Sequence, residues 1–334
     1  MRLKKCLASS ENRNRGLRLV WMAGGVFLAV CLASCTSFER LTRVTPEEFP
    51  RAELCGECHV EIHKEWAESP HARAYAEARY REATDGYRFT ACLGCHAPEP
   101  ALAEKPPLAR AAFREEGVTC VSCHLAEGKM LGPITPTGKV APHPVSVTPE
   151  RHRGSGFCGR CHTGTLAEWE AVKMEKKPMC QECHMPAVRR KVTQATSSFS
   201  KAIVAMEREM PQKRHTFVSA PTELASPAFA VSVAQDATGI TLRVRNNLAH
   251  SVPTGDFGFR VALLEAFTVD AKGTVRYLGQ RELIKQLGTG LPPQTLLEWK
   301  LPAAKGARSV LVRIRRLGRE SAPAAELFKT EVPL

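Results

Sequence analysis

The sequence predicts a chain of two parts: a mostly α-helical part rich in loops, followed by a small antiparallel β-sandwich. Three observations predict it. All 13 cysteines lie at or before Cys183, and the region that holds most of them has short helical patterns separated by Pro- and Gly-containing loops. From residue 227 onward, apolar and polar residues alternate with period two, as in strands with one buried face. Ahead of both parts lies a basic and then apolar segment.

Residues 1–34 have the composition of an export signal. Residues 1–18 hold six basic residues and one acid, and the apolar run Leu19–Ala33 follows. That run is too short to span a membrane comfortably, and its basic flank precedes it, which is typical of a secretory signal peptide. We therefore expect an exported protein from which residues 1–34 are removed.

The end of this segment, Leu32-Ala33-Ser34-Cys35, resembles the lipobox of bacterial lipoproteins. The resemblance implies that Cys35 becomes the first mature residue and carries the lipid. An ordinary signal peptide with an incidental cysteine is the alternative. Because Thr36 follows, rather than an aspartate, the outer membrane is the favoured location, with the protein facing either the periplasm or the cell exterior.

Five C-x-x-C-H runs occupy residues 55–184. Two thiols three residues apart can add to the two vinyl groups of one porphyrin, and the adjacent histidine then becomes the proximal ligand of the iron. The sequence therefore predicts five c-type haems. Their binding residues are Cys55, Cys58 and His59; Cys92, Cys95 and His96; Cys120, Cys123 and His124; Cys158, Cys161 and His162; and Cys180, Cys183 and His184.

Zinc sites, thioredoxin-like redox pairs and disulfides also use cysteine pairs, but none of them requires a histidine directly after the second cysteine. Histidine makes up 11 of 334 residues. Five such neighbours would arise by chance with odds of roughly 10⁻⁷. With ten cysteines in these motifs and residues 1–34 removed, Cys35 is the only other cysteine, so a lipidated chain has no free thiol.

Residues 35–215 are expected to form a pentahaem domain. Helices are predicted over Ala72–Ala83, Ala101–Glu115 and Leu166–Lys176, and a long loop over Gly128–Pro149. Such short elements cannot bury enough apolar surface by themselves. Porphyrin faces would supply the missing surface, so this domain should not fold without haem.

Residues 216–226 are expected to be a linker, and residues 227–334 a β-sandwich domain. Strands are predicted at Phe229–Val233, Ile240–Arg245, Val261–Val269 and Ser309–Ile314. The sequence Asp270-Ala-Lys-Gly273 predicts a hairpin turn after the third of them. Alternation of this kind is typical of antiparallel sandwiches.

The formal charge of +13 does not indicate nucleic-acid binding. Removal of residues 1–34 lowers it to about +8. Each haem then adds roughly −1 when ferric and −2 when ferrous through its propionates, which brings the expected charge near zero. The basic residues are therefore interpreted as counter-charges for propionates, and no nucleic-acid partner is expected.

Six histidines remain after five serve as proximal ligands: His63, His71, His143, His152, His215 and His250. Imidazole is a favoured iron ligand, so the near match of six to five predicts that most of the haems have two histidine ligands. His63 lies four residues after His59, on the same side of a helix, and cannot reach the far face of the haem that His59 holds.

Several segments resemble the cytochrome c-554 family of multihaem cytochromes, relatives of hydroxylamine oxidoreductase. They are Cys55-x-x-Cys58-His59 followed by Trp66-x-x-Ser69-x-His71-Ala72, then Gly117-Val-Thr-Cys120-x-x-Cys123-His124, and later Arg214-His215-x-Phe217. Asn247-x-x-His250-x-x-Pro253-Thr-Gly255 with Arg260 resembles a turn of β-domains fused to multihaem cytochromes, whose histidine reaches back to an iron.

Two departures from these patterns occur, Leu125 and Ala249, at positions where the related proteins commonly have glycine. The resemblance implies distal ligand roles for His71, His143, His215 and His250. The fifth distal position remains open between His152, which we include in the predicted iron-ligand set, His63, Met174 or Met179, and no protein ligand.

The favoured function is electron relay between redox partner proteins of the cell envelope, with the lipid as anchor. If every iron is six-coordinate, no small substrate can bind, and the reduced protein should not take up carbon monoxide. The alternative is an oxidoreductase with one open iron that acts on a small nitrogen or sulfur oxyspecies. No C-x-x-C-K run occurs, although pentahaem nitrite reductases use one at their catalytic haem. Nothing in the sequence predicts the oligomeric state.

Overall fold

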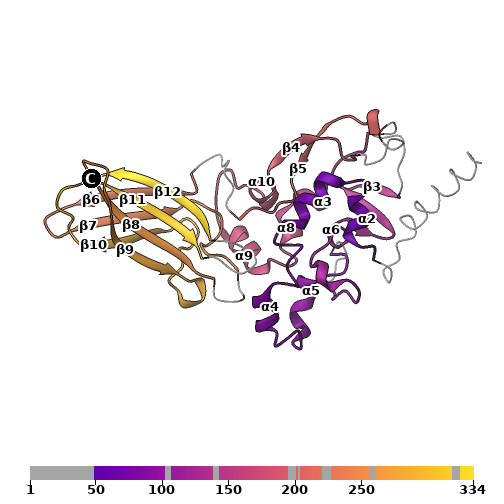
Figure 1. Ribbon diagram of the computed structural model, residues 1–334, viewed down its shortest axis with the longest axis horizontal. Helices are drawn as coiled ribbons and strands as arrows, with labels where there is room; N and C mark the ends of the chain where they lie inside the picture. The colour runs from indigo at the N-terminus through magenta and orange to yellow at the C-terminus, as the bar shows by residue number, and fades with distance from the viewer. Residues whose placement is uncertain are drawn as a thin grey trace, which may run out of the picture.

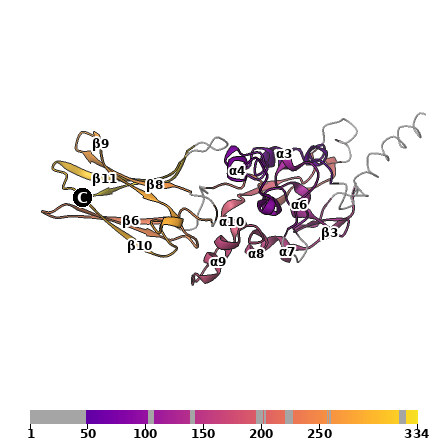
Figure 2. The same cartoon turned by 90° about the horizontal axis from the view of Figure 1, so that it is seen from below.

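The computed structural model describes residues 49–101, 107–137, 143–194, 201, 204–219, 227–255, 257, 260–317 and 324–334. The expected signal peptide and Cys35 lie outside these residues. The molecule has two parts that lie end to end along its longest axis, with the helices at one end and the large sheets at the other (Figures 1 and 2). We call residues 49–219 the N-terminal part and residues 227–334 the β-domain.

The β-domain consists of two antiparallel sheets. One sheet has the strand order β10-β7-β6 and the other β12-β11-β8-β9. The strands are β6 (Phe229–Gln235), β7 (Ile240–Asn246), β8 (Ala262–Asp270), β9 (Val275–Leu283), β10 (Leu296–Leu301), β11 (Ala307–Arg316) and β12 (Ala325–Pro333).

The two sheets enclose one continuous apolar core. Every second residue of β7 is fully or almost fully buried, as the period-two pattern predicts, and the same alternation runs from Val310 to Ile314 of β11. The buried side chains include Leu242 and Val244 of β7, Leu264 of β8, and Val310 and Val312 of β11, each 0% exposed. Apolar burial of this kind is the main stabilising contribution to the fold of a β-sandwich.

All four predicted strands are confirmed, at β6, β7, β8 and β11. The predicted turn is also confirmed: Gly273 N donates to the Asp270 carbonyl (3.0 Å), and Gly273 has a φ of +79°, which glycine adopts without strain. Sequence patterns missed β9, β10 and β12. In β9 most side chains are exposed, so it carries little of the alternation that marks a half-buried strand.

The N-terminal part contains less helix than the mostly α-helical fold that the sequence predicted for it. The helices in its described ranges are short, and the longest of these has nine residues. They are α2 (Ala52–Gly56), α3 (Val60–Ala67), α4 (Ala78–Ala83), α5 (Leu93–His96), α6 (Cys120–His124), α7 (Pro149–Arg153), α8 (Ser155–Cys158), α9 (Thr163–Ala171) and α10 (Cys180–His184), with 3₁₀ turns η1 (Thr90–Cys92) and η2 (Arg114–Glu116).

The helix predicted over Ala101–Glu115 is wrong for the residues described there. Residues 107–113 form no helix, and only η2 follows them. The reason is Arg110, whose side chain is 1% exposed and donates to the backbone carbonyls of Pro98, Ala112, Phe113 and Gly117 at 2.7–3.2 Å. A buried guanidinium thus satisfies carbonyls that would otherwise need helix hydrogen bonds.

The other two predicted helices are shorter than expected. Only α4 forms within Ala72–Ala83, because the backbone at His71 instead accepts a hydrogen bond from Val118 N (2.9 Å). The helix α9 ends at Ala171, where Lys177 Nζ donates to the carbonyls of Trp169, Glu170 and Val172 at 2.8–3.3 Å. A lysine that donates to the last carbonyls of a helix favours its termination there.

Two small sheets complete the N-terminal part. One joins β1 (Leu125–Ala126), β2 (Lys129–Gly132) and β3 (Val145–Val147), with β2 and β3 parallel. The other pairs β4 (Ala187–Arg190) with β5 (Met210–Lys213). None of the helices in the described ranges is long and apolar enough to cross a membrane.

The N-terminal part has almost no side-chain core. Among its described residues, the one apolar cluster of buried side chains consists of Phe49, Val121 and Leu125, with Met130 packed against it. A polypeptide of this length normally needs far more apolar burial to fold. The contrast with the β-domain indicates that something other than side chains fills the interior of the N-terminal part.

We predict that Leu264→Ala destabilises the β-domain by about 3 kcal/mol, because it leaves a cavity in a fully packed core. The free energy of unfolding can be measured by denaturant titration of the full chain, followed by circular dichroism of the sheets. Leu296→Ala on β10 is the matched control, because Leu296 is 55% exposed; it should cost less than about 1 kcal/mol. Equal losses in both variants would contradict the packing described for β8.

Candidate haem-binding sites

Each C-x-x-C-H run forms a single helical turn. The motif coincides with α6 and with α10, and in the first and fourth motifs His59 N and His162 N donate to the carbonyls of Cys55 and Cys158 at 2.8 and 3.0 Å. Residues at i, i+3 and i+4 of a helix share one face. The local fold therefore points two thiols and one imidazole to the same side, as attachment and proximal ligation of one porphyrin require.

Backbone carbonyls orient four of the five motif histidines. Each of these carbonyls lies near Nδ1 of the ring, so Nε2 is left to face a metal. The distances are 2.9 Å from His59 to Val192 O, 2.6 Å from His96 to Ala74 O, 2.7 Å from His124 to Leu131 O, and 2.7 Å from His184 to Val218 O.

Four motif histidines face a second histidine at nearly the same separation. Two imidazoles on opposite sides of one metal, each bonded at about 2 Å, place their ring centroids roughly 6 Å apart. The observed centroid distances are 6.4 Å for His59 and His143, 6.2 Å for His162 and His71, 6.2 Å for His124 and His215, and 6.1 Å for His184 and His250.

Burial keeps these imidazoles neutral, which is the form that binds metals. Burial lowers the pKa of His71 to about 3, and the charges of His162 and His215 act in the same direction. Burial likewise lowers the pKa of His124 to about 3 and that of His215 to about 4. The pKa values of His143 and His250 are also lowered, again mainly by burial.

A buried carboxylate holds the segment that carries His215. Glu65 accepts two hydrogen bonds from Arg190 (2.8 and 2.9 Å), one from Arg214 (2.7 Å) and one from His215 N (3.0 Å). Burial alone would raise the pKa of Glu65, but these donors hold it below its ordinary value. Glu65 on α3 thereby fixes the position of His215, 150 residues further along the chain.

A second carboxylate ties the β-domain to the N-terminal part next to His250. Glu168 of α9 accepts hydrogen bonds from Ser251 N (2.8 Å) and Ser251 Oγ (3.0 Å), and Lys285 Nζ lies 2.6 Å from it. The Thr165 and Thr254 hydroxyls are also in contact, at 2.8 Å. His250 therefore reaches His184 from a loop of the β-domain that is fixed at its base.

The structure brings neither His152 nor His63 into such a pair. The rings of His152 and His124 are nearly parallel, with an interplanar angle of 13° and centroids 5.1 Å apart. This separation is shorter than that of the four pairs, so the two rings stack on each other. Its two ring nitrogens lie 3.3 and 3.2 Å from the carbonyls of Thr148 and Cys123. His63 lies against Trp66, with ring centroids 5.4 Å apart.

His96 differs from the other motif histidines. All 11 histidines of the chain lie in described ranges, and none of them faces His96 at the spacing of the four pairs. Tyr80 stacks on the face of the His96 ring, with ring centroids 3.9 Å apart and an interplanar angle of 10°. Tyr75 and Tyr87 stack on each other at 4.3 Å nearby. Sequence patterns gave no hint of this tyrosine cluster.

The two methionines considered as ligands are engaged elsewhere. The sulfur of Met174 accepts from Gln294 Nε2 (3.8 Å), and that of Met179 accepts from the Ser155 hydroxyl (3.5 Å).

Contacts between cysteines give the spatial order of the five motifs. The Cys55 thiol lies against that of Cys120, Cys95 against Cys161, and Cys158 against Cys180. Cys123 is close enough to Cys158 and Cys161 to act on both electrostatically. The first motif therefore meets the third, the fourth meets the second and the fifth, and the third lies near the fourth.

The interior of the N-terminal part fits porphyrin groups. Its described residues form only one small apolar cluster of their own, and its ten cysteines form no disulfides. Several buried polar atoms also lack a hydrogen-bond partner, as expected where propionates would be acceptors. They are Arg73 Nε, Tyr80 Oη, His143 Nδ1, Thr148 Oγ1, His215 Nδ1 and Thr216 Oγ1.

Two comparisons with known proteins find a related family model and a related fold. Residues 54–125 match the family model described as cytochrome c554 and c-prime. A penta-haem cytochrome c552 from Thermochromatium tepidum is 19% identical and shares the fold, with a TM-score of 0.55 over 88% of this chain and 100% of that one.

A second solved structure, ApaA from Bordetella pertussis, is 11% identical, and the match covers 32% of this chain and 89% of that chain. Its TM-score of 0.19 is too low to indicate a shared fold. No curated protein matches the chain.

We predict that Glu65→Gln lowers the free energy of unfolding by about 3 kcal/mol, because Arg190 would lose its charged partner while buried. Glu61→Gln is the control: Glu61 is 57% exposed and lies 3.5 Å from the same arginine, so its loss should stay within about 0.5 kcal/mol. Denaturant titration of the haem-loaded protein, followed by haem absorbance, measures both.

The Glu65→Gln effect should also depend on pH. The pKa of Glu65 is lower in the folded than in the unfolded chain, where it lies near 4.5. Its contribution is therefore fully present above that value and is lost as the pH falls through the folded value. The difference between the original protein and Glu65→Gln should shrink on acidification below pH 4.5; a constant difference would argue against an ionised Glu65.

Proposed function

We propose that the chain is a multihaem c-type cytochrome that transfers electrons through five covalently bound haems, four of them held between two histidines. The observation that carries the proposal is the recurrence of four imidazole pairs at 6.1–6.4 Å. Bound haem iron would supply the one-electron couple, while the protein sets its ligands and surroundings.

In this proposal the proximal ligands are the five motif histidines, and the distal ligands are His143, His71, His215 and His250. These belong to the first, fourth, third and fifth motifs respectively. The proposal removes His152 from the ligand set inferred from sequence, because it lies beside His124 and both of its nitrogens face backbone carbonyls.

The contacts between thiols support a branched path for electrons. Because thioether sulfurs attach at the porphyrin edge, motifs whose thiols meet would hold haems with neighbouring edges. The fourth motif meets the second and the fifth and lies near the third, so the haem of His162 would be the branch point. The haems of His59, His96 and His184 would be the three ends, where partners exchange electrons.

We further propose that the protein works at the cell envelope. The signal-like residues 1–34 and the lipobox-like end at Cys35 support export followed by lipid anchoring. A lipid on Cys35 and the β-domain would hold the haems near redox partner proteins, at the outer membrane and facing the periplasm or the exterior.

A second candidate function is catalysis at the His96 haem. In contrast to the other four motif histidines, His96 faces no second imidazole. An open position would admit a small ligand, which supports the oxidoreductase alternative and its nitrogen or sulfur oxyspecies. The two functions are compatible, because electrons that arrive from the branch point could be used at this end.

We predict that the reduced protein binds one carbon monoxide per chain, because carbon monoxide requires an open position on ferrous iron. Removal of a distal ligand should open one more, so His250→Ala should bind two. His152→Ala is the matched control and should still bind one. Absorbance titration of the purified, reduced protein counts the sites.

Each alternative result has a meaning. No binding by the original protein would mean that the His96 haem has a sixth ligand and would remove the second candidate function. An unchanged count in His250→Ala would remove His250 from the ligand set, and a higher count in His152→Ala would restore His152 to it.

A further inference from the structure

The His96 ring is in contact with one short segment of the chain. This segment, residues 74–87, precedes the second motif and contains α4. Its first residue is Ala74, whose carbonyl lies 2.6 Å from His96 Nδ1. Tyr80 of the same segment lies on the face of the His96 ring, with ring centroids 3.9 Å apart and an interplanar angle of 10°. The segment therefore contacts the imidazole both at its edge and on its face.

These two contacts together fix the plane of the ring. A hydrogen bond at Nδ1 orients a ligating histidine, but a bond at one atom leaves the ring free to turn about that atom. A flat side chain packed on the face of the ring blocks this rotation, because the turned imidazole would collide with it. Tyr80 is itself 7% exposed, so its ring is enclosed by its neighbours.

Two further tyrosines pack against Tyr80. The ring centroids of Tyr75 and Tyr87 lie 6.0 and 5.9 Å from that of Tyr80. The rings of Tyr75 and Tyr87 stack on each other, with centroids 4.3 Å apart and an interplanar angle of 5°. Aromatic rings attract each other at such distances. These contacts limit the movement of the Tyr80 ring away from His96.

The turn that carries Tyr87 has a strained backbone. Asp85, Gly86 and Tyr87 have φ values of +52°, +65° and +70°, a region that only glycine adopts without cost. Thr84 links this turn to α4, because its hydroxyl donates to the Tyr80 carbonyl (2.7 Å) and accepts from Tyr87 N (3.3 Å). Strained backbone persists where surrounding contacts hold it, and it is frequent at functional sites. Here it keeps Tyr87 in contact with Tyr80.

His96 is the motif histidine that no second imidazole faces, so a haem at the second motif would have His96 as its one histidine ligand. We propose that Tyr80 is a positioning residue whose ring fixes the plane of the His96 imidazole against the porphyrin. The other two tyrosines hold Tyr80 in place. This role rests on the proposed haem at the second motif.

The orientation of a ligand imidazole can be measured without any assay of activity. The plane of the ring determines which iron d orbitals overlap with the ligand, and therefore the g-values of a ferric haem in electron paramagnetic resonance. Partners of a ligating histidine act on the haem through this orientation. Loss of the Tyr80 ring should allow His96 more than one orientation, so the signal of one haem should shift or broaden.

The test uses the purified, haem-loaded full chain and three variants. Tyr80→Leu removes the stacked ring. Tyr80→Phe keeps the ring and removes only the hydroxyl, which has no hydrogen-bond partner among the described residues. Tyr277→Leu is the matched control, because it makes the same substitution on β9, where Tyr277 is 60% exposed. Electron paramagnetic resonance spectra of all four ferric proteins are compared.

We expect the signal of one haem to shift or broaden in Tyr80→Leu, while the spectra of Tyr80→Phe and Tyr277→Leu match that of the original protein. An unchanged spectrum in Tyr80→Leu overturns the proposal. An equal change in either of the other two variants also overturns it, because the stacked ring would then not be the cause.

Haem content, measured by mass spectrometry on the same samples, separates this role from the proposed function. An original protein without haem on Cys92 and Cys95 removes both, whereas five haems with four identical spectra remove only the role of Tyr80.

If Tyr80→Leu alone loses a haem, the comparison is repeated with Tyr87→Leu and Tyr87→Phe. These variants leave the Tyr80 ring in place and change one of the rings that pack against it. A shift in Tyr87→Leu but not in Tyr87→Phe supports the proposal, and identical spectra overturn it.

Discussion

The spacing between facing imidazoles is the constraint on which the N-terminal part depends. Four pairs of rings lie 6.1–6.4 Å apart, although their members are separated by between 66 and 91 residues along the chain. The short helices and the two small sheets form the backbone that carries these rings. The buried Glu65 fixes one part of that backbone by accepting a hydrogen bond from His215 N. The one apolar cluster among the described residues of this part is Phe49, Val121 and Leu125, so side-chain packing there does not explain this precision. Porphyrins between the rings would supply both the spacing and the missing apolar interior.

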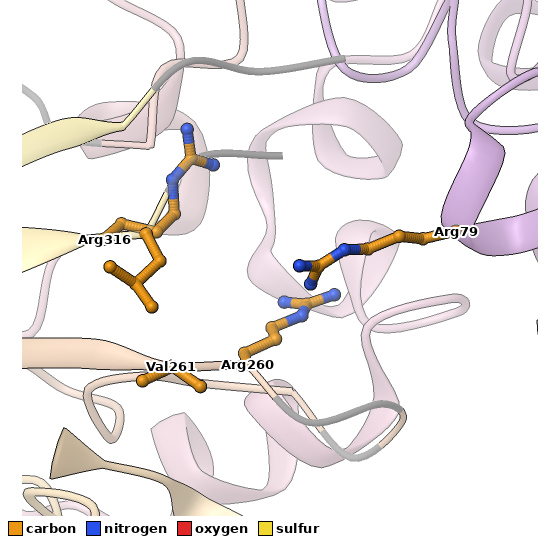
Figure 3. A pocket seen from close by; sticks show the side chains of 5 residues that line it. Arg79, Arg260, Val261 and Arg316 are labelled. Atoms are coloured by element: carbon orange, nitrogen blue, oxygen red, sulfur yellow. The ribbon is translucent and has the colours of Figure 1, made fainter. Parts of the chain in front are cut away.

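The β-domain has a conventional core and also contributes to the sites. Its loop brings His250 opposite His184, and Glu168 fixes that loop through Ser251. Arg260 and Arg316 of the β-domain also line a small cavity together with Arg79 of α4 (Figure 3). The sandwich thus presents one imidazole, that of His250, to the N-terminal part. Folding of the β-domain and completion of the His184 pair are therefore linked.

Local patterns in the sequence predicted the features that depend on neighbouring residues. The C-x-x-C-H runs predicted which thiols and imidazoles share a face, and alternation predicted β6, β7, β8 and β11. Features set by distant contacts were not predictable in this way. The Ala101–Glu115 segment is not helical where it is described, because Arg110 buries its guanidinium against the carbonyls of a loop. The spacing of histidines along the sequence likewise could not distinguish the two histidines near His124. His215 faces that ring at 6.2 Å, whereas His152 stacks on it at 5.1 Å.

The most direct test of the account is the mass of the intact, purified protein, together with its haem content per chain. The account predicts a polypeptide heavier than its sequence by five covalently attached haems, one for each C-x-x-C-H run. A polypeptide without added mass, or with the N-terminal part folded while its ten motif thiols remain free, would contradict it. In that case another explanation would be needed for the four imidazole pairs and for the nearly absent core around them.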